Sequence, residues 1–198
     1  MANHEISNEV RINVKNLHFA TIEEAEGEIT FGTPEHIIGA EQVSRKASVS
    51  SGKLYGDGLV RFNVSKKTAV ELTINANSIG QKWRSYIEGT KISSSGVESG
   101  SSEDVAKPFA IGWEVEKTSG KSEFIWFPYC IGEPIENSTQ QSEDNTNFSR
   151  DTLTVVAMQH PKVKRLYTLV DQENEKCKTV TAEQFFSKVQ ITDEVVGA

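Results

Sequence analysis

The sequence predicts a mainly β fold, and two observations lead to this prediction. Apolar and polar residues alternate with a period of two along several short stretches, which is typical of strands with one buried face. Helical spacing is confined to two short segments, each preceded by residues that favour a helix start. With 36% hydrophobic and 25% charged residues, the 198-residue chain is long enough for one domain with a core, spanning residues 1–198.

Strands are expected wherever the alternation lasts for several residues. In TAVELTINAN, for example, the apolar residues Val70, Leu72 and Ile74 are separated by polar ones. Side chains at every second position share one face of a strand, so such a stretch buries one face and exposes the other. The expected strands, in chain order, are 10–20, 42–49, 70–76, 109–115, 123–132, 152–158 and 163–170.

Two helices are expected, one beside the strands and a short one near the C-terminus. Ser78 and Gln81 have the spacing of a capping box, and the apolar residues that follow recur at helical spacing until Gly89. Thr181 and Gln184 repeat the same spacing before a second apolar run. The first helix therefore flanks the strands with one apolar face, and the second is a short C-terminal helix.

Segments outside these elements differ in character. The polar stretches 93–104 and 136–147 have the composition of solvated loops. The segment 48–67 is instead interpreted as a long inter-strand loop with apolar residues, and an apolar projection of this kind usually has a partner. Residues 1–9 form an N-terminal extension and residues 190–198 a C-terminal tail.

The sequence carries no pattern typical of catalysis, cofactor binding or metal binding. The four histidines occur singly, and the two cysteines, Cys130 and Cys177, lie far apart and outside any metal-ligand spacing. No run of about 18 apolar residues and no signal-like N-terminus is present, so we expect neither a membrane span nor secretion. The net charge of −7 has the wrong sign for a protein that grips phosphates, so any contact with nucleic acid is expected to be non-adhesive.

The stretch EFIWFPYCIG is apolar on both faces, which raises the question of what covers the second face. Alternation places Phe124, Trp126 and Cys130 on one side. The residues expected on the other side, as candidates for an interface within a ring, are Ile125, Phe127, Tyr129 and Ile131. Cover by a helix or second sheet of the same chain and cover by a neighbouring subunit both remain open.

The order of several segments resembles the major tail tube protein of long-tailed, siphophage-type bacteriophages. VKNLHFATI precedes FGTPEHIIGAEQVS, then KLYGDGLVRFN, then TAVELTINA leading into a helix, and finally KPFAIGWEVE followed by FIWFPYC. The resemblance implies a β-sandwich-like or barrel-like subunit, six of which form a ring. The inner sheets of the ring join into one continuous β-barrel, and rings stack into a hollow tube.

The resemblance also implies a structural virion protein with no active site and no cofactor, assembled in the host bacterial cytoplasm. Its partners would be further copies of itself, the tape-measure protein that the tube surrounds, and the tail terminator and distal tail proteins. The tube would conduct viral double-stranded DNA into the host without binding it specifically. The segment 48–67 would correspond to the loop that reaches the adjacent ring.

Individual residues follow from this comparison as candidates. The candidates for the channel wall are Glu71, Thr73, Asn75 and Lys46. The candidates for ring stacking are Lys53, Leu54, Tyr55, Asp57, Leu59 and Phe62. A tube protein of a tail-like bacteriocin or of a contractile injection system is an alternative with the same fold, and a soluble ligand-binding β-sandwich is an alternative from a different class.

Overall fold

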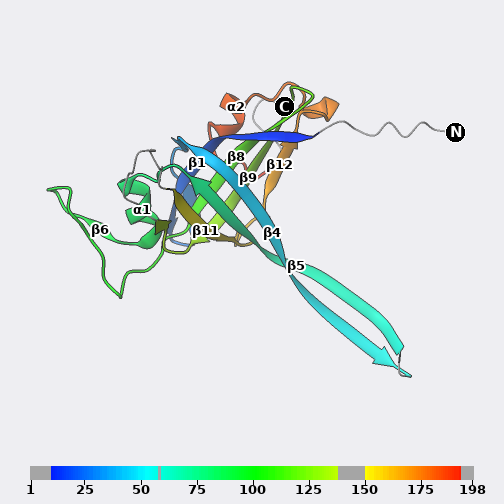
Figure 1. Cartoon of the computed structure of the whole chain (residues 1–198). Coiled ribbons are helices and arrows are strands. Elements are labelled where there is room, and N and C mark those ends of the chain that lie inside the picture. Colours follow the sequence, from blue (N-terminus) through cyan, green and yellow to red (C-terminus); the bar gives the residue numbers. More distant parts are fainter. Residues whose placement is uncertain (1–9, 58, 138–149, 193–198) are drawn as a thin grey trace, which may run out of the picture.

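Strands dominate the computed structural model, which describes residues 10–57, 59–137 and 150–192 (Figure 1). The strands are β1 (Arg11–Ala25), β2 (Glu28–Phe31), β3 (Glu35–Ile37), β4 (Ala40–Gly56), β5 (Leu59–Ala76), β6 (Lys91–Ile92), β7 (Glu98–Ser99), β8 (Phe109–Lys117), β9 (Ser122–Gly132), β10 (Glu136–Asn137), β11 (Asp151–Ala157) and β12 (Thr168–Asp171). The helices are α1 (Gln81–Glu88), α2 (Ala182–Phe186) and a 3-10 turn at Glu175–Cys177. None of the helices in the described ranges has the length and apolar character needed to cross a membrane.

One large antiparallel sheet organises the fold. Its strands run in the order β2-β1-β8-β9-β11-β5-β4, with β3 added to β1, β10 to β11 and β12 to β9. The sheet curls until β4, at one end of this order, comes close to the first half of β1, although no ladder joins the two strands (Figure 1). The mainly β prediction is confirmed, and the architecture is a curled sheet with its concave side filled by side chains.

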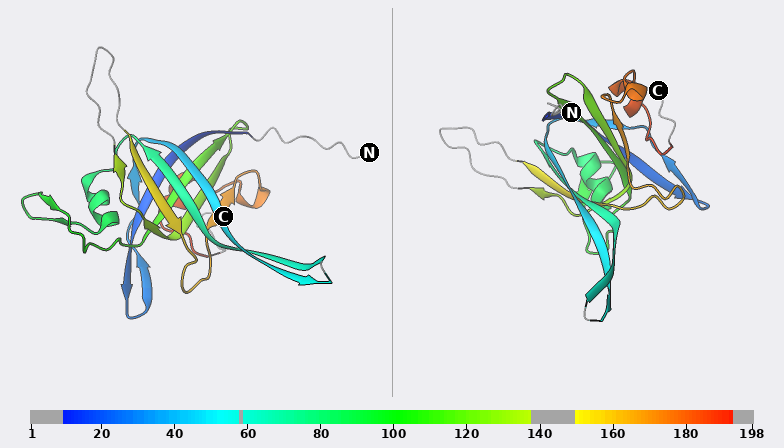
Figure 2. Two further views of the ribbon diagram at one scale, coloured as in Figure 1. Left: turned by 60° about the horizontal axis from the view of Figure 1, so that its bottom comes forward. Right: turned by 90° about the vertical axis from the view of Figure 1, so that its right-hand side faces the viewer.

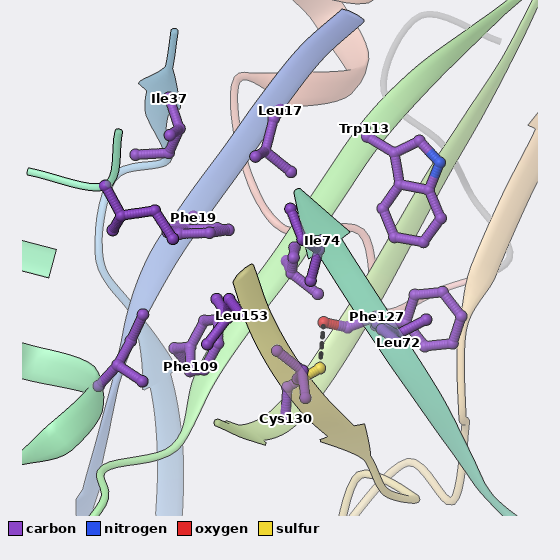
Figure 3. Packing of buried hydrophobic residues seen from close by; sticks show 14 of the residues in the cluster. Leu17, Phe19, Ile37, Leu72, Ile74, Phe109, Trp113, Phe127, Cys130 and Leu153 are labelled. Atoms are coloured by element: carbon purple, nitrogen blue, oxygen red, sulfur yellow. Dashed lines mark hydrogen bonds between the residues drawn. The ribbon is translucent and has the colours of Figure 1, made fainter. Parts of the chain in front are cut away.

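The main hydrophobic core lies inside the curl. Leu17 and Phe19 of β1 meet Leu72 and Ile74 of β5 there, and all four side chains are fully buried (Figure 3). Helix α1 adds Trp83, whose ring lies 5.3 Å from that of Phe19 in an edge-to-face arrangement. The helix therefore closes one side of the core, as a flanking helix with one apolar face should.

A second, smaller core lies on the other face of β1, β8 and β9. Phe124 and Trp126 point into it, and the C-terminal segment covers them with Phe185 and Phe186 of α2. The Trp126 indole Nε1 donates a hydrogen bond to the carbonyl of Phe185 at 3.2 Å, which holds the helix in place. The second face of EFIWFPYCIG is thus covered by the same chain.

Both helices begin near the predicted positions, but only one begins with the predicted cap. Thr181 and Gln184 form the complete capping box at the start of α2. Helix α1 instead has Gly80 as its N-cap, without a side-chain cap, so the predicted role of Ser78 is wrong. The amide of Ile79 just before it donates to the buried carboxylate of Asp151 at 2.7 Å, a long-range contact that a local pattern cannot reveal.

Two further expectations need correction. Only Thr168–Asp171 of the predicted strand 163–170 is a strand, because the chain turns between His160 and Arg165, whose backbone groups are hydrogen-bonded. The segment 48–67 is not a loop, since β4 and β5 continue through it as paired strands. The polar stretch 93–104 is mostly turns, with β7 inside it. The extension 1–9, the segment 138–149, which includes most of the second polar stretch, and the tail from 193 onward lie outside the described residues.

Candidate assembly surfaces

The most conspicuous surface feature is a two-stranded ribbon that projects from the sheet (Figure 2). We call it the distal ribbon, and it consists of residues 49–56 of β4 and 59–67 of β5. The ladder pairs Val49 with Lys67 at its base, Leu54 with Phe62 farther out and Gly56 with Leu59 at the tip. Hydrogen bonds between the two strands hold the ribbon together, while its side chains lack cover from the described parts of the chain.

A β-bulge marks the point where the ribbon leaves the body. Ser48 pairs with Ala69 and Val49 pairs with Lys67, so Thr68 is the extra residue on β5. Its hydroxyl donates to the carbonyl of Ser48 at 3.3 Å. A bulge bends its strand and increases the local twist, which gives the ribbon a fixed departure angle from the sheet.

Every ring-stacking candidate lies in or at the tip of this ribbon and is exposed. Leu54, Tyr55, Leu59 and Phe62 each keep between 63% and 66% of their surface accessible. Lys53 is exposed as well, and Asp57 at the tip forms an ion pair with Arg61 at 2.7 Å. Single exposed apolar residues are ordinary, but a row of them on an isolated ribbon is a contact surface without a partner. Their role in stacking stays a prediction.

The channel-wall candidates share one face of the sheet formed by β4, β5 and β11. Leu72 and Ile74 of β5 point into the core, so Glu71, Thr73 and Asn75 point away from it. Lys46 of β4 lies directly opposite Glu71 in the ladder. The same face carries hydroxyl and amide groups on the neighbouring strands, namely Gln42, Ser44, Thr152 and Thr154. We call this the polar face.

Side chains on the polar face are linked across the strands. The amide of Asn75 donates to Gln42 at 3.3 Å and accepts from the hydroxyl of Thr152 at 3.0 Å. Lys46 and Glu71 are the two charged members among the residues named above, and they have opposite signs. The same rows also hold Val156, opposite Glu71, and the exposed Glu136, opposite Thr152, so the residues named here make a mostly polar face with one basic and two acidic side chains.

The structure contradicts part of the predicted ring interface. Ile125 and Phe127 are 1% and 0% exposed and belong to the main core of the subunit. Cys130 lies in the same main core, although alternation along the sequence places it on the side of Phe124. The pairing of β8 with β9 shifts between Phe109 and Ile111, and this shift reverses the expected alternation. Two of the four candidates, Ile125 and Phe127, are thus part of the subunit's own core rather than of its outer surface.

Tyr129 and Ile131, the other two candidates, are half-buried and reach the surface. The Tyr129 hydroxyl and the carboxylate of Glu24 are hydrogen-bonded at 2.9 Å. Burial, together with this bond and the charge of Glu24, raises the pKa of Tyr129. Ile131 lies opposite Val156 in the ladder, beside the polar face. Their contact with a neighbouring subunit stays a prediction.

Sequence reasoning missed a group of ion pairs at one end of β1, β8 and β9. The buried carboxylate of Glu123 accepts two hydrogen bonds from Arg11, at 2.8 and 3.0 Å. Lys117, only 4% exposed, donates to both oxygens of Asp171 at 2.6 and 2.7 Å. A signal was present, because Glu123 and Lys117 interrupt otherwise apolar strands and a buried charge needs a partner.

The pKa of Asp171 follows from this arrangement. Burial by itself raises the pKa of the carboxyl group, but the hydrogen bond from Lys117, the backbone amide of Glu173 and the charges of Lys117 and Arg11 outweigh it. The net result is a pKa below the ordinary value of 3.8. These pairs have a structural role, and within the described ranges no group of three or more His, Cys, Asp or Glu side chains is placed to hold a metal ion.

Comparisons with known proteins give a structural likeness at the level of overall shape. The sequence matches no protein-family model and no curated protein. Among solved structures, the fold is similar to a chain of the sheath–tube complex of an extracellular contractile injection system (PVC) in its extended state, determined by cryo-EM. The TM-score is 0.46 with 10% sequence identity, and the match covers 86% of this chain and 99% of the other. A likeness at this level does not assign a function.

Proposed function

We propose that this protein is a structural subunit that assembles into a hollow tube, of the kind found in phage tails and phage-tail-like injection systems. The observation that carries the proposal is the distal ribbon, which displays apolar side chains where the described chain offers them no cover. A protein that keeps such a surface needs a partner, and a repeated assembly of identical copies supplies one at every position.

The energetics favour assembly through many contacts at once. Burying a large apolar side chain contributes about 1.5–3 kcal/mol, so burial of the ribbon's exposed apolar residues contributes on the order of 10 kcal/mol. Association costs roughly 4–15 kcal/mol in lost freedom of motion. One ribbon contact is therefore marginal, whereas a ring in which every copy both gives and receives a contact is stable. Assembly should depend steeply on protein concentration.

The polar face supplies a suitable channel wall. Hydroxyl and amide groups present no strong charge to a passing polymer, and the opposite charges of Lys46 and Glu71 offset each other. Double-stranded DNA is held by lysine and arginine, so a polar wall with few basic side chains lets it slide. In the finer form of the proposal, the rings are hexamers, the tube surrounds a tape-measure protein, and the polar faces join into one inner barrel that conducts DNA.

The tube of a contractile system and that of a non-contractile tail are both compatible with this geometry. A contractile system places a sheath around its tube, so its tube must present an outer surface to a second protein. Co-purification of tubes with a sheath protein from the native particle would assign the contractile type. Tubes that carry no second layer would assign the type found in long-tailed siphophages.

Negative-stain electron microscopy of the purified chain over a range of concentrations tests the proposal. We expect rings or tubes at high concentration, and we expect the paired substitution Leu54→Ser and Phe62→Ser to abolish them while the subunit stays folded. Ile92→Ser with Val97→Ser is the matched control, because these residues are also exposed, at 41% and 60%, on a different projection. A wild-type chain that stays monomeric at every concentration would refute the proposal.

A further inference from the structure

A slot separates β1 from β4 where the curled sheet fails to close. Its sides are residues 11–14 of β1 and residues 41–43 and 45 of β4. The partly buried Val115 lies at its floor, above the core residues Trp113 and Ile125, which are 3% and 1% exposed. The slot is open to solvent and has a volume of about 340 Å³. The slot therefore has room for large side chains above an apolar floor.

Both sides of the slot are unpaired strand edges within the described ranges. Strand β3 covers the outer edge of β1 from Leu17 to Phe19 and β2 covers it from Ile22, but neither reaches residues 11–14. Strand β4 pairs with β5 on one side alone. Unpaired edges offer backbone donors and acceptors to any strand that approaches, and an added strand is a common mode of recognition.

The distal ribbon has the features that the slot requires. Its β5 strand has a free outer edge from Leu59 to Val64, since β11 pairs with β5 only between Val70 and Ala76. Phe62 and Val64 lie two residues apart on this strand and so point to the same side. Laid along the slot, the strand would place both side chains on the floor while its backbone pairs with an open edge.

The ribbon cannot reach the slot of its own chain. Leu54 lies 11 positions beyond Val43 along β4, which corresponds to about 36 Å in an extended strand. The ribbon also points away from the body of the protein (Figure 1). Ribbon and slot are therefore two different surfaces that can meet only between copies.

Most charged groups at the slot already have partners within the same chain. Arg11 is bound to Glu123, and Glu41 is bound to Arg150 at 2.8 Å, so these charges at the slot are satisfied. Arg45 lines the slot and forms no ion pair with a residue in the described ranges. Asp57 at the ribbon tip is already paired with Arg61 at 2.7 Å, so the pairing of ribbon and slot rests on shape, apolar contact and open strand edges rather than on charge.

From these observations we propose that the slot between β1 and β4 receives the distal ribbon of a second copy of this chain. The inference rests on the proposed assembly and names the surface that receives the ribbon. The contact is head-to-tail, because each copy presents a ribbon on one side and a slot on another. Such an interface either closes into a ring or continues as a helical tube.

Cysteine cross-linking tests the contact directly. In the full chain with Cys177→Ser, Phe62→Cys and Val43→Cys should form disulfides between copies under mild oxidation and give a ladder of multimers on a non-reducing gel. Cys130 is fully buried and is left in place. Phe62→Cys with Ile92→Cys is the control, and it should give at least tenfold less cross-linked product. Equal cross-linking of the two pairs would overturn the proposal.

Mixing two half-defective variants provides a second test. The ribbon variant, Leu54→Ser with Phe62→Ser, keeps an intact slot, and Val43→Glu blocks the slot but keeps an intact ribbon. Each should stay monomeric alone, with wild-type circular dichroism. Because a single ribbon contact is marginal, their mixture should give one-to-one dimers only at high protein concentration, and these dimers should grow no further. If Val43→Glu alone forms normal tubes, the slot does not receive the ribbon and the proposed tube function still stands. If the wild-type chain does not assemble and the chain with Phe62→Cys and Val43→Cys does not cross-link, both proposals fail.

Discussion

Replacing Gly112 with alanine should destabilise the subunit, because this glycine makes room for the second core. Gly112 lies in the middle of β8, opposite Trp126 of β9. A Cβ at this position would be 2.6 Å from Trp126 Cδ2 and 2.9 Å from the backbone oxygen of Ile125. The indole is pinned by Phe186 and by its hydrogen bond to Phe185, so it cannot move aside freely.

The magnitude follows from two opposing effects. Overpacking a core costs about 1–3 kcal/mol. Removing the freedom of a glycine in the unfolded chain returns about 0.4–1 kcal/mol. The net loss of roughly 1–2 kcal/mol should lower the urea midpoint by about 0.5–1 M for a slope near 2 kcal/mol/M. For a protein of this size, the melting temperature should fall by about 2–8 °C.

Two companion variants decide whether the reasoning holds. Gly52→Ala is the control, since no heavy atom lies within 4 Å of its added Cβ, and its stability should be unchanged or slightly increased. In the double variant Gly112→Ala with Trp126→Leu, the clash is removed, so the loss should be smaller than the sum of the two single losses. A Gly112→Ala subunit as stable as Gly52→Ala would refute the packing described for the second core.

Three further outcomes are expected. Phe127→Asp should abolish folding, measured by circular dichroism, because it buries an unpaired charge in the main core; a folded monomer would contradict this placement. Asp171 has a lowered pKa in the folded state, so the stability it adds is present above its unfolded pKa near 3.8 and is lost as the pH falls below that value. Asp171→Asn should therefore flatten the pH dependence of urea stability in that range, while an unchanged curve would show that the Lys117 pair does not act in this way. Glu71→Lys should leave the subunit folded and the tubes intact but make them retain double-stranded DNA on a filter at low salt and release it at high salt; salt-independent retention would exclude an electrostatic cause.

Much of the fold could be predicted from the sequence because the buried faces repeat every two residues. Val70, Leu72 and Ile74 are buried as the alternation requires, and Thr181 with Gln184 begins α2 as the local pattern requires. These features depend on neighbouring residues alone. Local patterns of this kind are read directly from a single sequence.

Features that depend on distant contacts could not be predicted in the same way. The start of α1 is stabilised by Asp151, which lies 72 positions from Ile79, so Ser78 was a misleading signal. The reversal of Cys130 comes from a shift in the pairing of β8 with β9. The sequence of the ribbon resembled that of a loop because both faces of the ribbon are exposed. Without a buried face, its apolar and polar residues need not alternate. Of the candidate surfaces, the slot was invisible in the sequence, since it exists only where the curl leaves two edges apart.

The distribution of charged residues over the subunit determines how DNA would interact with the polar face. The net charge of −7 predicts that any contact with nucleic acid is non-adhesive, which an acidic or a neutral wall would provide. The polar face pairs Lys46 with Glu71 and otherwise carries mostly hydroxyl and amide groups along its central rows, with Val156 and Glu136 beside them. Other acidic residues lie away from this face. The exposed end of the hairpin formed by β1 and β2 carries Glu23, Glu24, Glu26 and Glu28. If this face lines a channel, low friction arises because it has few basic groups that could bind phosphates. Replacing Glu71 with lysine would then add a ring of positive charge, one lysine per copy. That is why Glu71→Lys should have a large effect on DNA retention while leaving the fold unchanged.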